Sequence, residues 1–453
     1  MFERLRTLLF ALPLVLLAGW ALAPEPPPRD GRLHIQYWEK WTSFEGDAMR
    51  AVVDRFNRIQ DRIYVEYLAV SQVDQKMLLA TAGGNPPDVA GLWAFNVHVF
   101  ADNGSLRPLD DLCARDGIGP EDYLPCYWEL ARHRGRTWVL PTTPATVALH
   151  WNKKHFREAG LDPERPPRTL EELVEFADRL TVRDGDRIRR MGFMPSEPGW
   201  WNWGWGYWFG GELWDGKSRI TADSPENIRA FEWVQGFAKR YGTKELSVFQ
   251  SGFGNFDSPQ NAFISGQVSM VLQGVWMNNF IRTHNPTMEW GAAPFPHPAD
   301  RPDLARSTVV DMDVLAIPTG ARHPEAAWEF IKFVQSHEGM ELLCLGQRKH
   351  SPLSSMTPEF VRRHPHPYLQ LFYDLAKSGR TFHTPRIGIW REYQDEMKNA
   401  FEEIWTNGKD PAAMLRRVRE RMQPKLDAEL ERARRRGWLQ AHSLLAPAAH
   451  ALP

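Results

Sequence analysis

The chain has 453 residues, of which 43% are hydrophobic and 25% are charged, and its formal net charge is -1 at pH 7. This composition is that of a globular protein large enough to bury the cores of two lobes or domains. A net charge this small excludes a chain that is steered as a whole toward nucleic acid or an anionic membrane. The unusual component is tryptophan, with 20 residues, which favours a ligand surface or an aromatic core.

Residues 1–23 have the pattern of a signal peptide. Arg4 and Arg6 precede an apolar run at 8–17, and Ala21-Leu22-Ala23 forms an A-x-A cleavage signal. The apolar run is shorter than the roughly 20 residues of a membrane-spanning helix, and no later run approaches that length. We therefore expect an exported, periplasmic protein that is cleaved near Ala23 and, lacking a cysteine there, is not a lipoprotein. An uncleaved membrane anchor is the alternative.

The first third of the mature chain alternates between two hydrophobic periods. Period-two segments predict strands, and segments of period 3.6 predict helices. The strands are expected at 32–38, 62–68 and 88–93, and the helices at 45–60 and 72–84. This β-α-β-α-β order favours an α/β fold with a parallel, doubly wound sheet.

The middle of the chain continues the α/β pattern. Two strands are predicted at 138–141 and 146–151, with PTTPA between them. Two helices carry clear end signals: Thr169 and Glu172 form a capping box for a helix at 169–180, and the segment 224–242 begins with Ser-Pro and ends with Gly. A further strand is expected at 267–274.

The last third begins with a strand and then becomes helical. The strand at 307–318 has a polar interruption at Asp311 and Asp313, and Pro324 begins a helix within 323–336. Mostly helical sequence follows from about residue 366, and an Ala- and Pro-rich tail at 436–453 is expected to be disordered. The order of elements suggests two lobes with several crossovers, and clefts between such lobes are preferred ligand sites.

The chain has three cysteines. In an oxidising compartment Cys113 and Cys126 could close a short loop, and we expect that disulfide, with free thiols as the alternative. No CxxC occurs and the 15 histidines lack ligand spacing, so we expect neither a metal site nor a cofactor.

Seven segments, in chain order, carry a family resemblance. They are YWEKWTSFEG, GGNPPDVAGLW, LPTTPATVALHWNKKHFREAGLD, FGGELWD, GQVSMVLQGVWM, AAPFPHP and EAAWEFIKFVQSHEGMELLCLGQRKHSP. Together they resemble the family 1 extracellular solute-binding proteins of ABC importers, the maltose-binding-protein type. The resemblance covers roughly residues 32–430.

The resemblance implies a two-lobed periplasmic-binding-protein fold of type II, with a sugar cleft between the lobes. Lobe one would comprise 32–142 plus 308–350, and lobe two 146–305 plus 355–435. The protein would be a monomer without enzymatic activity that captures a sugar, closes by a hinge and docks on an ABC permease. Hinge candidates are Pro141–Ala145 and the end of the 309–317 strand.

In lobe one, the resemblance implies ligand contacts at the ends of two strands. Trp41, Thr42, Ser43 and Glu45 lie on the turn after the first strand, and Trp93 and Asn96 follow the third. Sugars present flat C–H faces ringed by hydroxyls, so tryptophan beside polar side chains suits them. Asp88 is more simply explained as a brace for its turn.

In lobe two, the stretch GWWNWGWGYWFGG, residues 199–211, lies where the family has an aromatic platform. Helical spacing would place Trp200 and Trp203 on one face and Trp201 and Trp205 on another, so only one face could meet ligand. We favour the pair Trp200 and Trp203, with Trp201 and Trp205 as the alternative. A core role for the whole cluster is the other interpretation.

Further candidates match the family or interrupt apolar sequence. Trp276 and Trp390 match aromatic positions, and Asp311, with Arg348 or His350, are polar candidates. The maltose type also has an acidic residue on its crossing strand, where this chain has Pro144, Ala145 and Thr146. Maltose specificity is therefore not implied.

Other classes of function remain as alternatives. A glycoside hydrolase would need two carboxylates about 5–9.5 Å apart, and Glu45, Asp311 and Glu197 have no spacing that indicates such a pair. A lectin-like surface protein would usually show repeats or extra modules. Within the binding-protein interpretation, a glycerol-phosphate-type polyol is possible, with Arg348, Arg386 or Arg391 serving the phosphate.

Overall fold

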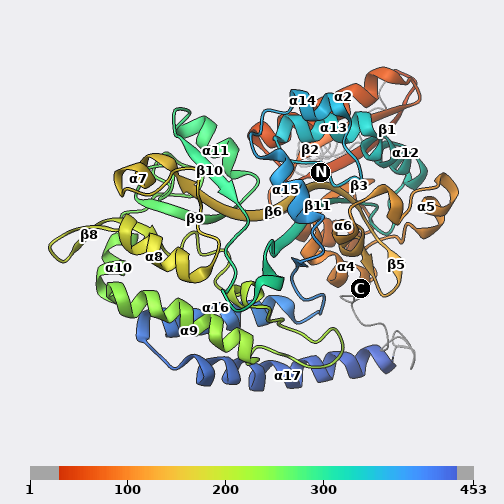
Figure 1. The fold of residues 1–453 in the computed structure, drawn as a ribbon. Coiled ribbons are helices and arrows are strands. Elements are labelled where there is room, and N and C mark those ends of the chain that lie inside the picture. Colours follow the sequence, from red (N-terminus) through yellow and green to blue (C-terminus); the bar gives the residue numbers. More distant parts are fainter. Residues whose placement is uncertain (1–29, 436–453) are drawn as a thin grey trace, which may run out of the picture.

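The structure is a computed structural model that describes residues 30–435. The predicted signal peptide at 1–23 and the predicted tail at 436–453 lie outside the described residues. Within the described range the chain forms two α/β halves, with long helices along the outside of the second half (Figure 1). In that same range, no helix has the length and apolar character that crossing a membrane requires.

The first half is built on a parallel sheet. Strands β1 (Leu33–Glu39), β2 (Ile63–Ala69) and β3 (Val89–Trp93) alternate with helices α2 (Ser43–Ile59) and α3 (Val73–Ala82), and β1 pairs in parallel with both other strands. The predicted β-α-β-α-β order is confirmed. β1 buries alternate side chains and α2 buries one apolar face, as their hydrophobic periods require, whereas β3 buries four consecutive residues, Val89 to Leu92.

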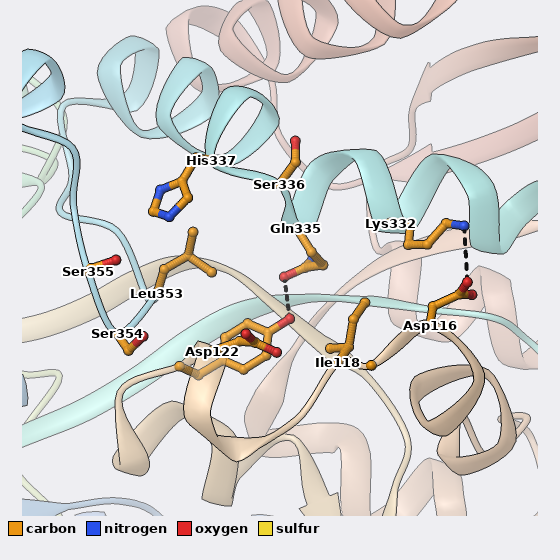
Figure 2. A pocket seen from close by; sticks show the side chains of 12 residues that line it. Asp116, Ile118, Asp122, Lys332, Gln335, Ser336, His337, Leu353, Ser354 and Ser355 are labelled. Carbon is orange, nitrogen blue, oxygen red and sulfur yellow. Dashed lines mark hydrogen bonds and ion pairs between the residues drawn. The ribbon is translucent and has the colours of Figure 1, made fainter.

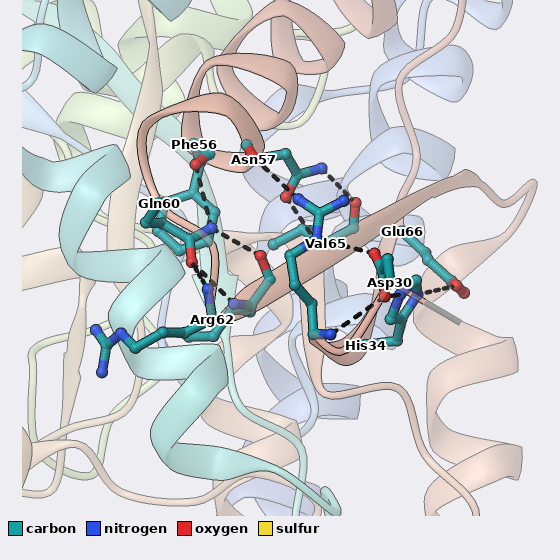
Figure 3. A network of polar contacts seen from close by, with 10 residues as sticks. Asp30, His34, Phe56, Asn57, Gln60, Arg62, Val65 and Glu66 are labelled. Atoms are coloured by element: carbon teal, nitrogen blue, oxygen red, sulfur yellow. Dashed lines mark hydrogen bonds and ion pairs between the residues drawn. The ribbon is translucent and has the colours of Figure 1, made fainter. Parts of the chain in front are cut away.

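Polar side chains fix the start of this sheet (Figure 3). Asn57 on α2 donates to the Val65 carbonyl (3.0 Å) and accepts from the Val65 amide (2.9 Å), so the side chain pairs with β2 as a neighbouring strand would. His34 on β1 lies between Asp30 and Glu66, at 3.1 and 2.8 Å. These contacts hold β1, β2 and α2 in register where the described chain begins.

The remaining elements of the first half are short helices, a small hairpin and two returning helices. They are η1 (Ala94–Asn96), α4 (Val97–Asp102), α5 (Asp110–Asp116), η2 (Pro120–Asp122), α6 (Pro125–Leu130), β4 (Arg132–His133), β5 (Arg136–Thr137), α12 (Pro324–Gln335) and α13 (His337–Gln347). Helix α12 begins at Pro324, as predicted, and packs its apolar face on the first half.

The second half has its own strands and helices. Its elements are α7 (Lys153–Glu158), α8 (Leu170–Leu180), β7 (Val182–Asp184), β8 (Arg187–Phe193), η3 (Trp205–Phe209), α9 (Pro225–Tyr241), α10 (Thr243–Gln250), β9 (Val268–Gly274), α11 (Met277–His284), β10 (Trp290–Ala293) and η4 (Pro302–Leu304). Both predicted N-caps are present: the Thr169 hydroxyl accepts from the Glu172 amide (3.2 Å), and that of Ser224 accepts from the Asn227 amide (3.3 Å). The predicted capping box is only half formed, because the Glu172 carboxylate accepts from the Arg168 amide (2.7 Å) instead of that of Thr169.

The end of the chain is helical, as predicted. It comprises α14 (Pro358–Arg363), α15 (Leu369–Ala376), the short β12 (Thr381–Phe382), α16 (Trp390–Asn407) and α17 (Pro411–Arg435). Figure 1 shows α9, α16 and α17 side by side along the outer edge of the second half, in agreement with their mutual contacts.

Two long strands join the halves. Strands β6 (Leu140–Asn152) and β11 (Thr308–Ala316) are antiparallel neighbours at the centre of a ten-stranded sheet. Eight of its strands have the order β2-β1-β3-β11-β6-β9-β8-β7, and the other two, β10 and β12, pair with β6 and β11. The prediction of two strands at 138–141 and 146–151 was wrong, because β6 is continuous through Pro141 and Pro144. A proline cannot donate to a strand ladder, and the pairing with β11 shifts register between Met312 and Val314, beside these prolines.

The predicted disulfide is also wrong. Cys113, Cys126 and Cys344 are all free and buried. Cys113 packs with the apolar residues around β1, α2 and α12, whereas Cys126 belongs to a different apolar cluster around β3, α6 and β11. Their closeness in sequence does not bring their sulfur atoms together, because the two side chains point into different parts of the core.

Candidate functional site

One face of β6 and β11 connects the cores of the two halves. At one end of this face Leu315 packs in the core of the first half, and at the other end Val309 packs in the core of the second. Because side chains alternate along a strand, Asp311 and Asp313 lie on this same face, between Val309 and Leu315. Two carboxylates therefore lie where the apolar surface of the joined cores is interrupted.

Trp93 lies beside these aspartates. It is the last residue of β3 and pairs directly with Asp313 in the antiparallel register of β3 and β11. Directly opposite residues project to the same face of a sheet, so the indole and the carboxylate are neighbours. The Trp93 side chain is 37% exposed, and the ammonium group of Lys40 lies 5.2 Å from its ring centroid.

Lys40 is the centre of a buried ion network. Its Nζ lies 3.1 Å from Glu39 Oε1 and 3.0 Å from Asp313 Oδ1. Burial acts to lower the pKa of Lys40, but the carboxylates of Asp313 and Glu39 outweigh it and raise that pKa above its ordinary value. Gly91 is required beside this network, because a Cβ there would lie 1.9 Å from Glu39 Oε2.

The turn after β1 contributes to the same network rather than presenting free groups. Glu45 Oε1 lies 3.0 Å from Nζ of Lys349, a lysine that follows α13. Trp41 is 5% exposed, with the Lys40 ammonium 4.7 Å from its ring centroid. Thr42 and Ser43 are exposed. Of the four predicted ligand residues on this turn, Trp41 is therefore buried in the core, and Glu45 forms an ion pair with Lys349.

Asn96 and Asp74 form a second polar pair near Trp93. Asn96 Nδ2 donates to Asp74 Oδ2 at 2.6 Å, and Asp74 Oδ1 has no hydrogen-bond partner among the described residues. Burial raises the pKa of Asp74 to about 6, against the lowering effect of the Asn96 hydrogen bond. Asp74 is 9% exposed, so this carboxylate has lost most of its water without gaining a cation.

Asp311 is the less satisfied of the two aspartates on β11. Its Oδ1 accepts from the Met312 amide at 2.9 Å, and it forms an ion pair with no residue of the described chain. Burial raises the pKa of the half-buried Asp311 to about 7. The register places Asp311 opposite Ala145, so β11 brings an acid to the level at which β6 lacks one.

Trp276 covers the same face in the second half. Gly274, at the end of β9, pairs with Val147, and a Cβ on Gly274 would lie 2.2 Å from the Trp276 ring. The indole therefore lies across Gly274, next to the level of Asp311 and Ala145. Its ring centroid is 5.8 Å from that of Trp200, which in turn is 4.2 Å from that of Phe256. Trp200 is 41% exposed.

The tryptophan-rich stretch is not a helix. Residues 200–203 form turns, and only Trp205–Phe209 forms a short 3-10 helix. Trp205 and Trp208 are fully buried, so a core role holds for part of the cluster. Trp203 and Trp390 are each 4% exposed and pack edge-on at 5.0 Å, so these two ligand candidates lie in the core, whereas Trp200, the predicted partner of Trp203, does not. Trp201 is half-buried, and its Nε1 donates to the Leu272 carbonyl (3.2 Å).

Arg348 and His350, the other polar candidates, form hydrogen bonds with protein groups. Arg348 Nη1 donates to Asn279 Oδ1 (2.9 Å), and Asn279 Nδ2 donates to the Gln347 carbonyl (2.9 Å), which joins α13 to α11 across the two halves. His350 is fully buried and bonds to Thr146 (3.0 Å), whose alternation along β6 places it on the opposite face from Ala145. Asp88 braces its turn as predicted, since it accepts from the amides of Gln36 and His323.

The sequence predictions missed several polar groups at this junction. Lys40 and Lys349 were overlooked because a buried lysine has no sequence signal of its own. Glu197 was considered only as a poor catalytic candidate. It lies after β8 within three residues of Trp200, is half-buried, and has a pKa that burial raises to about 7. Near it, Ser196 Oγ and Asn202 Oδ1 are buried without partners among the described residues.

A separate cavity of about 390 Å³ lies between α5, the start of α13 and residues 353–355 (Figure 2). None of the predicted ligand residues lines it. Its most buried polar groups are already satisfied, since Tyr123 OH donates to Gln335 Oε1 (3.0 Å) and Gln335 Nε2 donates to the Pro141 carbonyl (3.0 Å). We do not assign the ligand site there. Within residues 30–435 no cluster of His, Cys, Asp and Glu could hold a metal ion.

Comparisons with known proteins agree on the class. The chain is 21% identical over 412 residues to the sn-glycerol-3-phosphate-binding periplasmic protein UgpB of Pectobacterium atrosepticum, covering 84% of this chain and 88% of the relative. It is 22% identical over 315 residues to the maltotriose-binding protein of Pyrococcus abyssi, covering 69% and 64%. The solved structure of CpMnBP1 with mannotriose bound superposes with a TM-score of 0.73, at 24% identity, over 86% of this chain and 99% of that one.

These findings confirm the predicted fold, which is that of two-lobed sugar-binding proteins, with β6 and β11 crossing between its halves. The family model described as bacterial extracellular solute-binding protein matches residues 42–341, which is well over half of the chain. The protein belongs to the family of bacterial extracellular solute-binding proteins, as the resemblance of its sequence segments predicted.

Proposed function

We propose that this solute-binding protein captures a sugar, most simply an oligosaccharide, between its two lobes and delivers it to an ABC permease. The lobes would have the limits expected from the sequence, 32–142 plus 308–350 and 146–305 plus 355–435. The proposed setting is the periplasm, with the protein acting as a monomer and without catalysis. The family assignment supports solute binding, and the identity of the solute is the proposal.

The observation that carries this proposal is the arrangement on the shared face of β6 and β11. Trp93 from the first half and the pair Trp200 and Trp276 from the second half flank Asp311. Aromatic rings suit the C–H faces of a pyranose, and carboxylate oxygens accept hydrogen bonds from its hydroxyls. Trp93 and Trp200 are the two aromatic side chains among the large, exposed hydrophobic residues of the described chain, one in each half.

Other polar side chains at this junction support the same proposal. Asn96 on the first half, and Glu197, Ser196 and Asn202 on the second, could complete the hydrogen bonds of the hydroxyls. Trp276 Nε1 is buried without a partner among the described residues and could also donate to the solute. Burying such groups is costly unless a partner is supplied, and a polyhydroxylated ligand supplies both donors and acceptors.

A phosphorylated polyol is the second candidate, because several relatives are named as binders of sn-glycerol-3-phosphate. A phosphate needs cations that are free to pair with it. Of the three arginines proposed for that role, Arg348 donates to Asn279 and Arg386 donates to Glu129. The third, Arg391, is exposed near the start of α16. The lysines Lys40 and Lys349 are bonded to carboxylates. These contacts favour a sugar over a phosphate ester.

The test is calorimetric titration of the mature protein with neutral mono-, di- and trisaccharides, and with glycerol phosphodiesters. We expect a dissociation constant on the order of micromolar, about -8 kcal/mol, for at least one saccharide. Trp276→Ala should weaken that binding by more than about 1 kcal/mol. The matched control is Trp128→Ala, since Trp128 is half-buried on α6 and stacks at 5.5 Å on Tyr123, which lines the separate cavity. Binding that is unchanged in Trp276→Ala would remove this residue from the site, and hydrolysis of a saccharide would favour an enzyme.

A further inference from the structure

The charges around the proposed cleft do not balance. Two lysines lie in this region, Lys40 and Lys349, together with Arg348, which donates to Asn279 and forms no ion pair within the described residues. They are opposed by a larger number of carboxylates: Glu39, Glu45, Asp74, Asp311 and Asp313. Three of these acids, Glu39, Glu45 and Asp313, already lie within ion-pair distance of the lysines. Asp74 and Asp311 are left without a cation.

The two remaining acids are close to the same lysine network. The carboxylates of Asp313 and Glu39 act on the pKa of Asp74, and that of Asp313 acts on the pKa of Asp311. Lys40 also acts on both, and His383 acts on Asp311. Lys40 itself is held between the rings of Trp41 and Trp93, at 4.7 and 5.2 Å, and is bonded to Glu39. It is therefore not free to move toward Asp311.

The burial of these acids indicates what a ligand must supply. Asp74 is 9% exposed and its Oδ1 is buried without a partner in the described part of the chain. Asp311 has one amide as its partner. A carboxylate that has lost water is best compensated by an opposite charge, and a hydrogen-bonded ion pair is stronger than a bond to a neutral hydroxyl. A sugar hydroxyl would donate a hydrogen bond to a carboxylate oxygen but would leave the negative charge of the carboxylate unpaired.

From this excess of unpaired carboxylate, and on the basis of the proposed function, we infer that the cleft prefers a sugar that carries a protonated amine. The ammonium group of such an amino sugar would pair with Asp311 on β11, while its ring stacks on the tryptophans of either lobe. The neutral sugar with a hydroxyl at the same carbon would bind more weakly. A phosphate ester would be repelled.

The experiment compares isosteric pairs that differ in one group. Glucosamine and glucose, galactosamine and galactose, and mannosamine and mannose are titrated calorimetrically at pH 7, together with sn-glycerol-3-phosphate and the disaccharides of glucosamine and glucose. In at least one pair the amine should bind about tenfold or more tightly than its partner, which corresponds to about 1.4 kcal/mol. Raising the salt concentration should narrow that difference.

Variants assign the effect to its residue. Asp311→Asn keeps the shape of the side chain and should bring the two members of the pair to within about threefold, whereas Asp54→Asn removes the same charge from the exposed face of α2 and should leave the preference intact. Thermal unfolding of each variant checks that it is folded. If Asp311→Asn does not fold, Asp74→Asn is used in its place, and it should reduce the preference in the same direction.

The possible results separate this inference from the proposed function. Equal or tighter binding of the neutral sugar overturns the amine preference but leaves sugar binding in place. An amine preference that survives in Asp311→Asn overturns the role of this residue. Binding of glycerol phosphate alone, or of no compound in the set or in the wider saccharide library, overturns both the preference and the proposed sugar-binding function.

Discussion

His350 should make the stability of the protein depend on pH. Its side chain is fully buried behind β6, and its Nδ1 lies 3.0 Å from the Ser351 carbonyl. Since a carbonyl can only accept, Nδ1 carries the hydrogen and the unprotonated Nε2 accepts from the Thr146 hydroxyl at 3.0 Å. Tyr127 OH lies 2.7 Å from that hydroxyl and completes a chain of hydrogen bonds through His350 and Thr146. This network fits the neutral imidazole.

The sign and size of the effect follow from the pKa. Burial lowers the pKa of His350 from 6.5 to about 4. Between these values the unfolded chain binds a proton that the folded chain does not, so stability is lost as the pH falls through this window. At pH 5 the unfolded histidine is almost fully protonated and the folded one is mostly neutral. The loss between pH 7 and pH 5 is then about 2 kcal/mol for this one side chain.

The assay is urea unfolding followed by tryptophan fluorescence, at pH 7 and at pH 5. The variant is His350→Gln, whose side chain does not titrate in this pH range and offers both a donor and an acceptor to the hydrogen bonds with Thr146 and Ser351. Its loss of stability on acidification should be smaller than that of the wild type by about 2 kcal/mol. His337→Gln is the control, because His337 is exposed and its replacement should leave the pH dependence unchanged. A loss in His350→Gln within about 0.5 kcal/mol of the wild type would refute this assignment.

Two further predictions concern the buried charges and the thiols. Lys40→Met should destabilise the protein by about 3–5 kcal/mol in chemical denaturation, because it leaves Glu39 buried without its cation and Asp313 with Lys349 alone, at 3.8 Å. The double variant with Asp313→Asn should cost less than the sum of the two single changes, and simple additivity would contradict the network. The thiol reagent DTNB should label none of the three cysteines in the native protein and all three after unfolding, since all are free and buried. Fewer than three labelled thiols in unreduced, unfolded protein would indicate a disulfide.

Local periodicity predicted most of the secondary structure. The strands and helices from β1 to β3 and the caps of α8 and α9 follow from hydrophobic spacing and from Ser, Thr and Pro at helix starts, which act within a few residues. β6 was misjudged because Pro141 and Pro144 argue against a strand when considered alone. Pairing with β11 and β9 on both sides holds it together, and that pairing is not visible in the local sequence.

The candidate site was predictable in part. The resemblance and the polar interruption of the strand singled out Trp93, Asp311 and Trp276 separately, and the pairing of the strands brings them to one face of the sheet. The stretch 199–211 was treated as a helix, but its glycines disfavour one, and Gly199 and Gly210 adopt positive φ angles of 87° and 84°. Trp203 and Trp390 became core residues because they pack on each other, a contact between positions nearly 190 residues apart that no local pattern reveals.

Because side chains alternate along β6 and β11, the two faces of this strand pair carry different groups of residues. Asp311 and Ala145 lie on the face between the two cores, whereas Thr146 lies on the opposite face and bonds to His350 and Tyr127. The opposite face is closed by buried contacts, so the first face is the one that the proposed closure of the lobes would cover. A solute held by Asp311 would bond to the strand that crosses between the lobes and would not rest on either lobe alone. Binding would then favour one arrangement of the lobes through the residue that also selects the solute, because a ligand shifts a conformational equilibrium only by its difference in affinity for the two states.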